Sequence, residues 1–290
     1  EYTETKTFHK DIEFAAGKVN KTTVAFAETQ CVVEGTAVSG GVQLMTKCLE
    51  KDNLYAFRAE LSEGDFRIRL TGENGGVYAP ASGSDINDGQ IAELTENAEG
   101  HWTVPAAGVY RVVVDFDDKT VVIYSPETDL KNVMVSYNNT VDKINPYTQE
   151  VTTLWMYGAF NNFSLKNHSL EQSLANPRLF TYYNSGTALP RNNKASLKFM
   201  VSNIANNVYA WGASGTQANS TETYKDDITI GTKTMIYGGQ GYNRYAFFVI
   251  PDGTNYIELY LGSEDKEKVT TVAGKEIVTA EDAYVLFDKR

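Results

Sequence analysis

The sequence predicts an all-β protein with two antiparallel β-sandwich modules in tandem. Helical signals are nearly absent, and short runs rich in β-branched and aromatic residues recur every 10 to 20 residues between Gly, Asn, Asp and Pro. A weak internal repeat places similar strand signals at equal offsets in the two halves: Phe66 to Tyr78 spans 12 residues, as does Leu197 to Tyr209. The length of 290 residues suits two domains of ordinary size.

Three segments follow from these signals. Residues 1–28 are too few for a domain and are expected to be an N-terminal extension or an edge strand. The first module is expected over residues 29–128 and the second over residues 129–290. Pro126 ends the last strand signal of the first module, and the polar residues that follow it mark the boundary.

Each module is expected to contain its own hairpin. In the first module, strands over residues 109–115 and 120–124 flank a turn in which Asp side chains can bond nearby backbone amides. The repeat aligns residues 244–250 with this first strand, which predicts a second hairpin of residues 245–250 and 255–261 around Pro251-Asp252-Gly253. Other expected elements are strands over residues 22–26, 30–34, 54–61 and 66–70, one or two helical turns over 169–174, and one or two strands within 275–287.

Composition and charge exclude several classes of protein. The net charge is −11 and no long basic run exists, so nucleic acid is not an expected partner. No run of 18 apolar residues exists to span a membrane.

Cys31 and Cys48 lie 17 residues apart, which is wrong for a metal knuckle and leaves two possibilities, separate thiols or one disulfide. No metal or other cofactor is expected.

Enzyme signatures are missing from the sequence. It contains no Gly-x-Ser-x-Gly or His-Glu-x-x-His motif, and its three histidines, His9, His101 and His168, lie in polar, loop-like stretches. A glycosidase needs a pair of carboxylates at a set separation, and no pair stands out among the 37 acidic residues. The chain is therefore expected not to be an enzyme, although a carboxylate pair between the modules would support a hydrolase.

Several short motifs of residues 29–126 resemble the SusE/SusF family, outer-membrane glycan-binding lipoproteins of Bacteroidetes. The motifs are Gly35-Thr36-Ala37, Leu54-Tyr55, the run from Leu61 to Ile68, Tyr78-Ala79-Pro80, and Trp102, Pro105, Gly108, Tyr110 and Asp115. The resemblance implies immunoglobulin-like or carbohydrate-binding-module-like sandwiches at the outer face of the outer membrane. It also implies a polysaccharide or oligosaccharide ligand for uptake, outer-membrane transport proteins as further partners, and membrane attachment through a lipid anchor upstream of residue 1.

The candidate ligand-binding residues lie in the second module. The family commonly has Gly-Trp after Gly-x-Ala, where the Trp helps form a sugar platform; here the first module has Gly40-Gly41. Stacking on sugar CH groups needs exposed rings flanked by polar side chains. The second module offers both in Asn161, Asn162, Phe163, Lys166, Tyr209 and Trp211. The alternative function is a structural or interaction scaffold of a transport assembly that binds no sugar, and buried rings would favour it.

Overall fold

The protein is all-β, as predicted. The computed structural model describes residues 29–72, 75–139, 144–189, 196–202, 209–213, 224–225, 227–240, 246–272 and 275–290, and within these ranges it contains strands and short 3-10 helices but no α-helix. The expected extension over residues 1–28, with its predicted strand, lies outside them. The sheets are antiparallel apart from the short β19–β22 pair.

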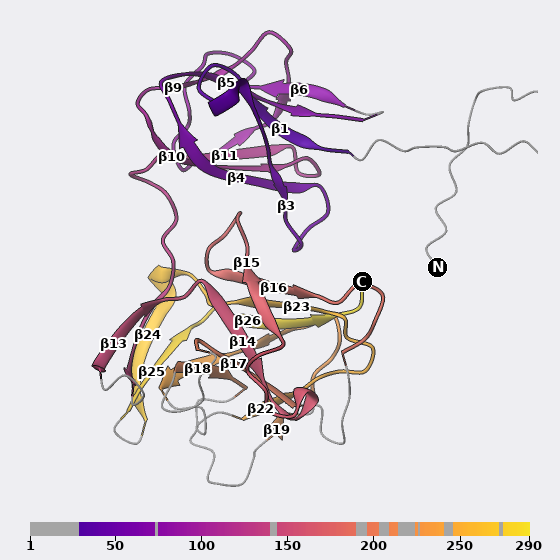
Figure 1. The fold of residues 1–290 in the computed structure, drawn as a ribbon, viewed down its shortest axis with the longest axis vertical. Coiled ribbons are helices and arrows are strands. Elements are labelled where there is room, and N and C mark those ends of the chain that lie inside the picture. The colour runs from indigo at the N-terminus through magenta and orange to yellow at the C-terminus, as the bar shows by residue number, and fades with distance from the viewer. Residues whose placement is uncertain are drawn as a thin grey trace, which may run out of the picture.

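The first unit consists of two sheets packed around a shared core. Its elements are β1 (Cys31–Glu34), η1 (Ser39–Gly41), β2 (Val42–Leu44), β3 (Thr46–Lys47), β4 (Leu54–Leu61), β5 (Gly64–Leu70), β6 (Gly76–Ala79), β7 (Ile91–Glu93), β8 (Thr95–Glu96), β9 (Trp102–Val104), β10 (Gly108–Asp115) and β11 (Thr120–Tyr124). One sheet has the order β2-β1-β5-β6-β8, with β9 paired to β5, and the other has the order β3-β4-β10-β11-β7. Figure 1 shows that β3, β4 and β10 lie nearest the second unit, whereas β5, β6 and β9 lie farther from it.

The second unit has more strands. Its elements are β12 (Met134–Asn139), β13 (Ile144–Glu150), β14 (Thr153–Tyr157), η2 (Ala159–Asn161), β15 (Ser169–Gln172), β16 (Leu179–Tyr183), β17 (Ser196–Met200), β18 (Tyr209–Gly212), β19 (Tyr224–Lys225), β20 (Lys233–Met235), β21 (Tyr237–Gln240), β22 (Phe247–Val249), β23 (Tyr256–Tyr260), η4 (Glu264–Lys266), β24 (Glu267–Val272), β25 (Lys275–Ala280) and β26 (Tyr284–Asp288). The main sheet runs β20-β26-β23-β16-β15-β14-β17-β18-β21-β25-β24, with β22 paired to β17, and β12 and β13 form a separate pair.

The strand pairing repeats between the two units. The path β4-β10-β11-β7 recurs as β16-β23-β26-β20, and the path β1-β5-β6-β8 recurs as β14-β17-β18-β21. In addition, β9 pairs with β5 as β22 pairs with β17. The equal spacing of Phe66–Tyr78 and Leu197–Tyr209 therefore corresponds to two equivalent strand pairs, β5–β6 and β17–β18.

A glycine follows the first strand of each path for the same reason. A Cβ on Gly35, after β1, would lie 2.2 Å from the backbone oxygen of Asp65, and a Cβ on Gly158, after β14, would lie 1.7 Å from that of Ser196. Each glycine thus lets two backbones approach more closely than a side chain would permit. Asp65 and Ser196 hold the same position in the repeat deduced from the sequence.

Two sequence predictions for the second module are wrong. Residues 245–250 and 255–261 do not form a hairpin, because in the described part of these segments β22 pairs with β17 and β19 while β23 pairs with β16 and β26. The counterpart of β10 is β23, and the counterpart of β11 is β26, with the β24–β25 hairpin inserted between them. Ser169–Gln172, expected to be helical, is strand β15. The expected strands within 275–287 are confirmed as β25 and β26.

Each unit has its own buried core. In the first, Phe66 and Trp102 stack with ring centroids 5.5 Å apart, and both are almost fully buried. Burying a side chain of this size contributes about 2–3 kcal/mol to folding. Both cysteines are free thiols, and burial raises the pKa of each to about 12. The second core includes Phe180, Phe199, Phe248 and Phe287.

Candidate functional site

The candidate site begins at the turn that follows β14, where Asn161 organises the backbone. Its side-chain amide donates to the carbonyl oxygens of Met156, at 3.0 Å, and Ser164, at 2.7 Å. Its side-chain oxygen accepts the backbone N–H of Gly158. Asn161 is buried by these contacts, so it shapes the turn from inside and is not presented to a ligand.

Phe163 leaves this turn with a strained backbone and an accessible ring. Asn162 and Phe163 have φ angles of 54° and 57°, a left-handed conformation that costs a residue with a side chain about 1–2 kcal/mol. The ring contacts Tyr157 and Phe247 edge-on, with centroids 5.3 and 6.2 Å away. The Phe163 side chain nevertheless stays 39% exposed. These two features together make Phe163 a candidate for contact with another molecule.

A buried cation supports this aromatic group. Lys198 on β17 lies almost entirely out of solvent, and its Nζ sits 4.1 Å from the ring centroid of Phe247. A cation over an aromatic face is attracted by the ring quadrupole, more strongly where water is excluded. Phe247 is thereby fixed beneath Phe163. We call Tyr157, Phe163, Lys198 and Phe247 the aromatic face.

The structure brings the predicted ligand-binding residues together only in part. Asn162, Phe163 and Lys166 are exposed around the turn, and their ligand contacts stay predictions. Tyr209 and Trp211 on β18 are only 6% and 5% exposed and belong to the core. Their ring centroids lie 4.8 Å apart. Neither ring therefore offers a face on which a sugar can stack.

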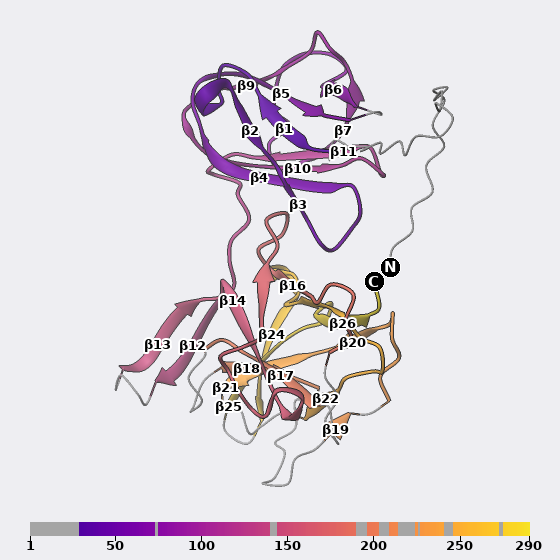
Figure 2. The same cartoon turned by 45° about the vertical axis from the view of Figure 1, so that its right-hand side comes forward.

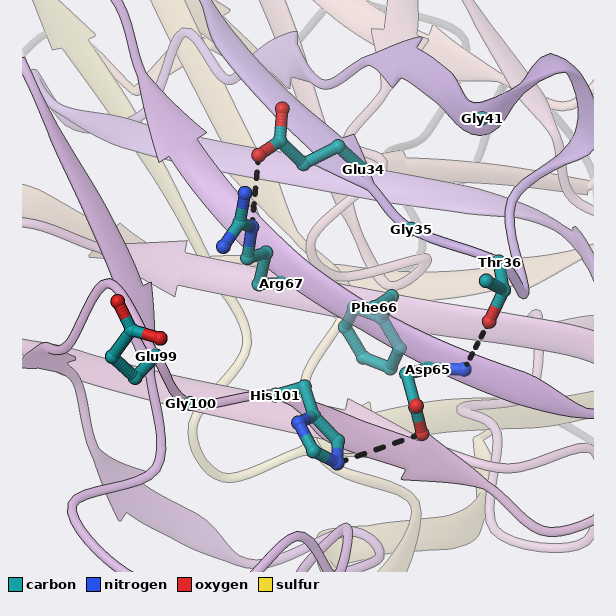
Figure 3. Close-up of a pocket in the computed structure, with 10 residues that line it drawn as sticks. All are labelled: Glu34, Gly35, Thr36, Gly41, Asp65, Phe66, Arg67, Glu99, Gly100 and His101. Atoms are coloured by element: carbon teal, nitrogen blue, oxygen red, sulfur yellow. Dashed lines mark hydrogen bonds and ion pairs between the residues drawn. The ribbon is translucent and has the colours of Figure 1, made fainter.

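The equivalent region of the first unit is a polar pocket of about 440 Å³ (Figure 3). Its floor is the Gly35–Thr36 turn and the start of β5. Gly40 and Gly41 have φ angles of 72° and 78°, so this unit also has two positive-φ residues after its first strand, but neither carries a ring. A Cβ on either glycine would meet nothing within 4 Å.

Charged pairs line this polar pocket. Glu34 accepts hydrogen bonds from Nε of Arg67 at 2.9 Å and from Nε of Arg69 at 2.7 Å. Although partial burial acts to raise it, these two arginines hold the pKa of Glu34 below its ordinary value. Across the pocket, His101 Nε2 lies 3.7 Å from a carboxylate oxygen of Asp65. The sequence analysis did not identify these charged residues. The pattern that could have indicated them is Glu34 on β1 beside Arg67 and Arg69, which alternate along β5.

The strand register relates the polar pocket to the aromatic face. Trp102 on β9 pairs with Phe66 on β5, and Phe248 on β22 pairs with Leu197 on β17. His101, the residue before β9, and Phe247, the first residue of β22, therefore hold equivalent positions. Arg67 and Lys198, one residue later on β5 and β17, are equivalent as well. The same place in the fold is thus ionic in one unit and aromatic in the other.

A metal site and a groove that contains carboxylates are further candidates within the described ranges. Within them, no three His, Cys, Asp or Glu side chains are grouped closely enough to hold a metal ion. A groove of about 500 Å³ lies beside the connection between the units and contains carboxylates. Of these, Asp129 is bound by Arg58 and Glu267 by Arg178. Each of these two carboxylates is therefore engaged by an arginine of the same groove.

In the part of the chain that the structure describes, no helix has the length and apolar character needed to cross a bilayer.

Comparisons with known proteins add one likeness. No protein-family model matches the chain, and no curated protein matches it in sequence. Among solved structures, it is similar to the crystal structure of SusF from Bacteroides thetaiotaomicron, with 12% identity and a TM-score of 0.29. The match covers 92% of this chain and 50% of that one, so the chain spans about half the length of the solved protein. A likeness at this level carries no argument about the ligand.

Proposed function

We propose that the protein binds a polysaccharide or oligosaccharide without transforming it, through the aromatic face of the second unit. The observation that supports this most directly is Phe163, an exposed ring held on a left-handed backbone by Tyr157 and Phe247. A phenyl ring whose position is already fixed by neighbouring rings can stack on the CH face of a sugar. Its side chain then loses little conformational freedom on binding. The exposed side chains of Asn162 and Lys166 supply hydrogen-bonding groups on the same turn.

The motif resemblance of residues 29–126 supports a cell-surface setting for this binding. In that setting the protein is attached to the outer membrane by a lipid anchor upstream of residue 1, on its extracellular face, and delivers glycan to transport proteins.

Affinity electrophoresis against soluble plant, host and microbial polysaccharides tests the proposal. The informative variant is Phe163→Gly, because glycine removes the ring and also relieves the positive φ. The relieved strain of about 1–2 kcal/mol offsets part of the stability lost with the ring contacts, about 0.5–1.5 kcal/mol each, and with the partial burial of the ring. A matched control is Tyr183→Ala, since Tyr183 is an aromatic residue of similar exposure, 41%, on β16 and is not part of the aromatic face.

We expect at least one polysaccharide to retard the wild type and the Tyr183→Ala variant. The Phe163→Gly variant should bind at least tenfold more weakly, a loss of about 1.4 kcal/mol or more. Equal retardation of all three proteins would rule out the aromatic face as the binding site.

A scaffold that binds no sugar is the second candidate function. The burial of Tyr209 and Trp211 favours it, as does the pair of glycines that replaces a platform ring in the first unit. If the folded wild-type protein is retarded by none of the polysaccharides, this candidate replaces the first.

A further inference from the structure

The sheet of the first unit that faces the second unit carries an apolar contact on its outer side. Along β4, Tyr55 and Phe57 point into the core, whereas Ala56 between them belongs to a separate cluster with Cys48 and Ala175. Ala56 is fully buried although it lies outside its own unit's core. Ala175 lies in the loop between β15 and β16, so the second unit covers this part of the sheet.

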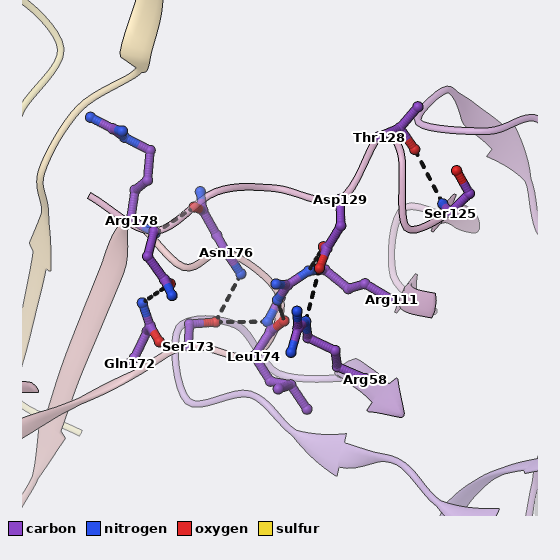
Figure 4. A network of polar contacts seen from close by, with 12 residues as sticks. Arg58, Arg111, Ser125, Thr128, Asp129, Gln172, Ser173, Leu174, Asn176 and Arg178 are labelled. Atoms are coloured by element: carbon purple, nitrogen blue, oxygen red, sulfur yellow. Dashed lines mark hydrogen bonds and ion pairs between the residues drawn. The ribbon is translucent and has the colours of Figure 1, made fainter. Parts of the chain in front are cut away.

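A buried arginine on the same side of the sheet joins the two units. Arg111 on β10 is only 4% exposed. Its Nε donates to Asp129 at 2.6 Å, and a second nitrogen donates to the backbone oxygen of Leu174 in the β15–β16 loop (Figure 4). Arg58 on β4 donates to the other oxygen of Asp129 at 2.8 Å. Asp129 lies in the connection between the units, so one carboxylate fixes that connection to the sheet.

The contact is reciprocal. The β3–β4 loop of the first unit reaches the second unit, where Ser173 donates to the carboxylate of Glu50. Arg290 donates to the backbone oxygens of Leu49 and, at 3.2 Å, Glu50. Its guanidinium stacks 3.4 Å from the ring centroid of Tyr256.

The two loops that interlock are counterparts in the repeat. β3 lies beside β4 as β15 lies beside β16, so each unit extends its equivalent loop onto the other. The contact accordingly has approximate twofold symmetry, in which equivalent surfaces of the two units meet.

We propose that these contacts, the junction, hold the two units as one rigid body with the polar pocket and the aromatic face at opposite ends. Figures 1 and 2 show β9, beside the pocket, at the far end of the first unit and β22, beneath the aromatic face, at the far end of the second. A short oligosaccharide held at the aromatic face is therefore separated from the polar pocket by the junction. The identity of the ligand rests on the proposed function, whereas the rigid arrangement does not.

Small-angle X-ray scattering of the full chain tests the junction without any glycan, so its failure is distinguishable from failure of sugar binding. Ala175→Asp places a carboxylate against Ala56 and near Glu50, which should separate the units. Ala81→Asp is the matched control, because Ala81 is exposed in the first unit away from the junction. Arg290→Ala removes the contacts that Arg290 makes with Leu49 and Glu50 and replaces no residue of either core cluster.

We expect the wild-type and Ala81→Asp profiles to match the one calculated from the structure, and the radius of gyration to rise in Ala175→Asp. Arg290→Ala should give a smaller rise, which keeps the test decisive if circular dichroism shows that Ala175→Asp is unfolded. A wild-type profile that requires several orientations of the units would overturn the proposal. So would folded junction variants that scatter as the wild type does.

Discussion

Replacing Trp211 separates a core role from a ligand-binding role for this residue. Its ring is 95% shielded, contacts Tyr209, and lies against Gly238 on the next strand, where a Cβ would come within 2.5 Å of the indole nitrogen. Truncating a buried Trp to Ala costs about 3–5 kcal/mol, because the lost burial is added to the cost of a cavity. In a unit of this size that corresponds to a fall in melting temperature of ~10 °C or more.

The assay is thermal unfolding of Trp211→Ala beside Phe163→Gly, followed by affinity electrophoresis at a temperature where both remain folded. We expect Trp211→Ala to lose stability but to keep the wild-type affinity for any glycan that binds. Phe163→Gly should show the reverse pattern. An unchanged melting temperature with lost binding in Trp211→Ala would refute the assignment of this ring to the core.

Three further predictions follow from buried groups. Gly158→Ala should destabilise the second unit by ~1–3 kcal/mol or more in urea unfolding, because its Cβ would overlap the backbone oxygen of Ser196; wild-type stability would contradict the close approach. Burial raises the pKa of Glu50 above its unfolded value, so this group's contribution to stability is present at acidic pH and is lost as pH rises through the folded pKa. The stability of Glu50→Gln relative to wild type should therefore increase from pH 4 to pH 8, and a constant difference would show that Glu50 does not titrate there. Cys31 and Cys48 should resist iodoacetamide at pH 8 until the chain unfolds, since both are buried and their thiols hold their protons; rapid labelling of the native protein, read by mass spectrometry, would disprove this.

Local patterns predicted the first module well because its hairpin is local in sequence. Strands β10 and β11 match the expected ranges closely. The turn between them is held by Asp115, whose carboxylate accepts the backbone N–H groups of Asp117 and Asp118 at 3.0 Å. Such a turn closes over a few residues, so alternation and turn chemistry suffice to identify it.

The second module departs from its prediction where pairing is not local. The 11-residue spacing shared by Tyr110–Val121 and Tyr245–Tyr256 is a coincidence, because β22 and β23 pair with different strands. The true partner of β23 is β26, and the β24–β25 hairpin inserted between them separates the pair along the chain. Spacing alone does not reveal such an insertion.

Burial on both faces of a strand explains why the candidate site was predicted only in part. All four residues of β18 are buried, Ala210 included, so alternation gives no sign of which face of the strand meets solvent. The prediction that Tyr209 and Trp211 are exposed ligand-binding residues is therefore wrong, because both are buried. The prediction for Phe163 rested on its stretch corresponding to the sugar-platform position of the family that the first module resembles, and the structure leaves this ring exposed.

The two units use different residue types at positive φ in the segment that follows their first path strand. Glycine meets the demand for positive φ at no steric cost, and the first unit uses Gly40 and Gly41 in this way. The second unit instead has Asn162 and Phe163 at positive φ and bears a strain that glycine would remove. Packing alone does not require this ring, because Phe247 already has Lys198 over its face and Phe163 remains well exposed. The proposed ligand contact would account for this strained, solvent-facing ring, and Phe163→Gly is the substitution that tests it.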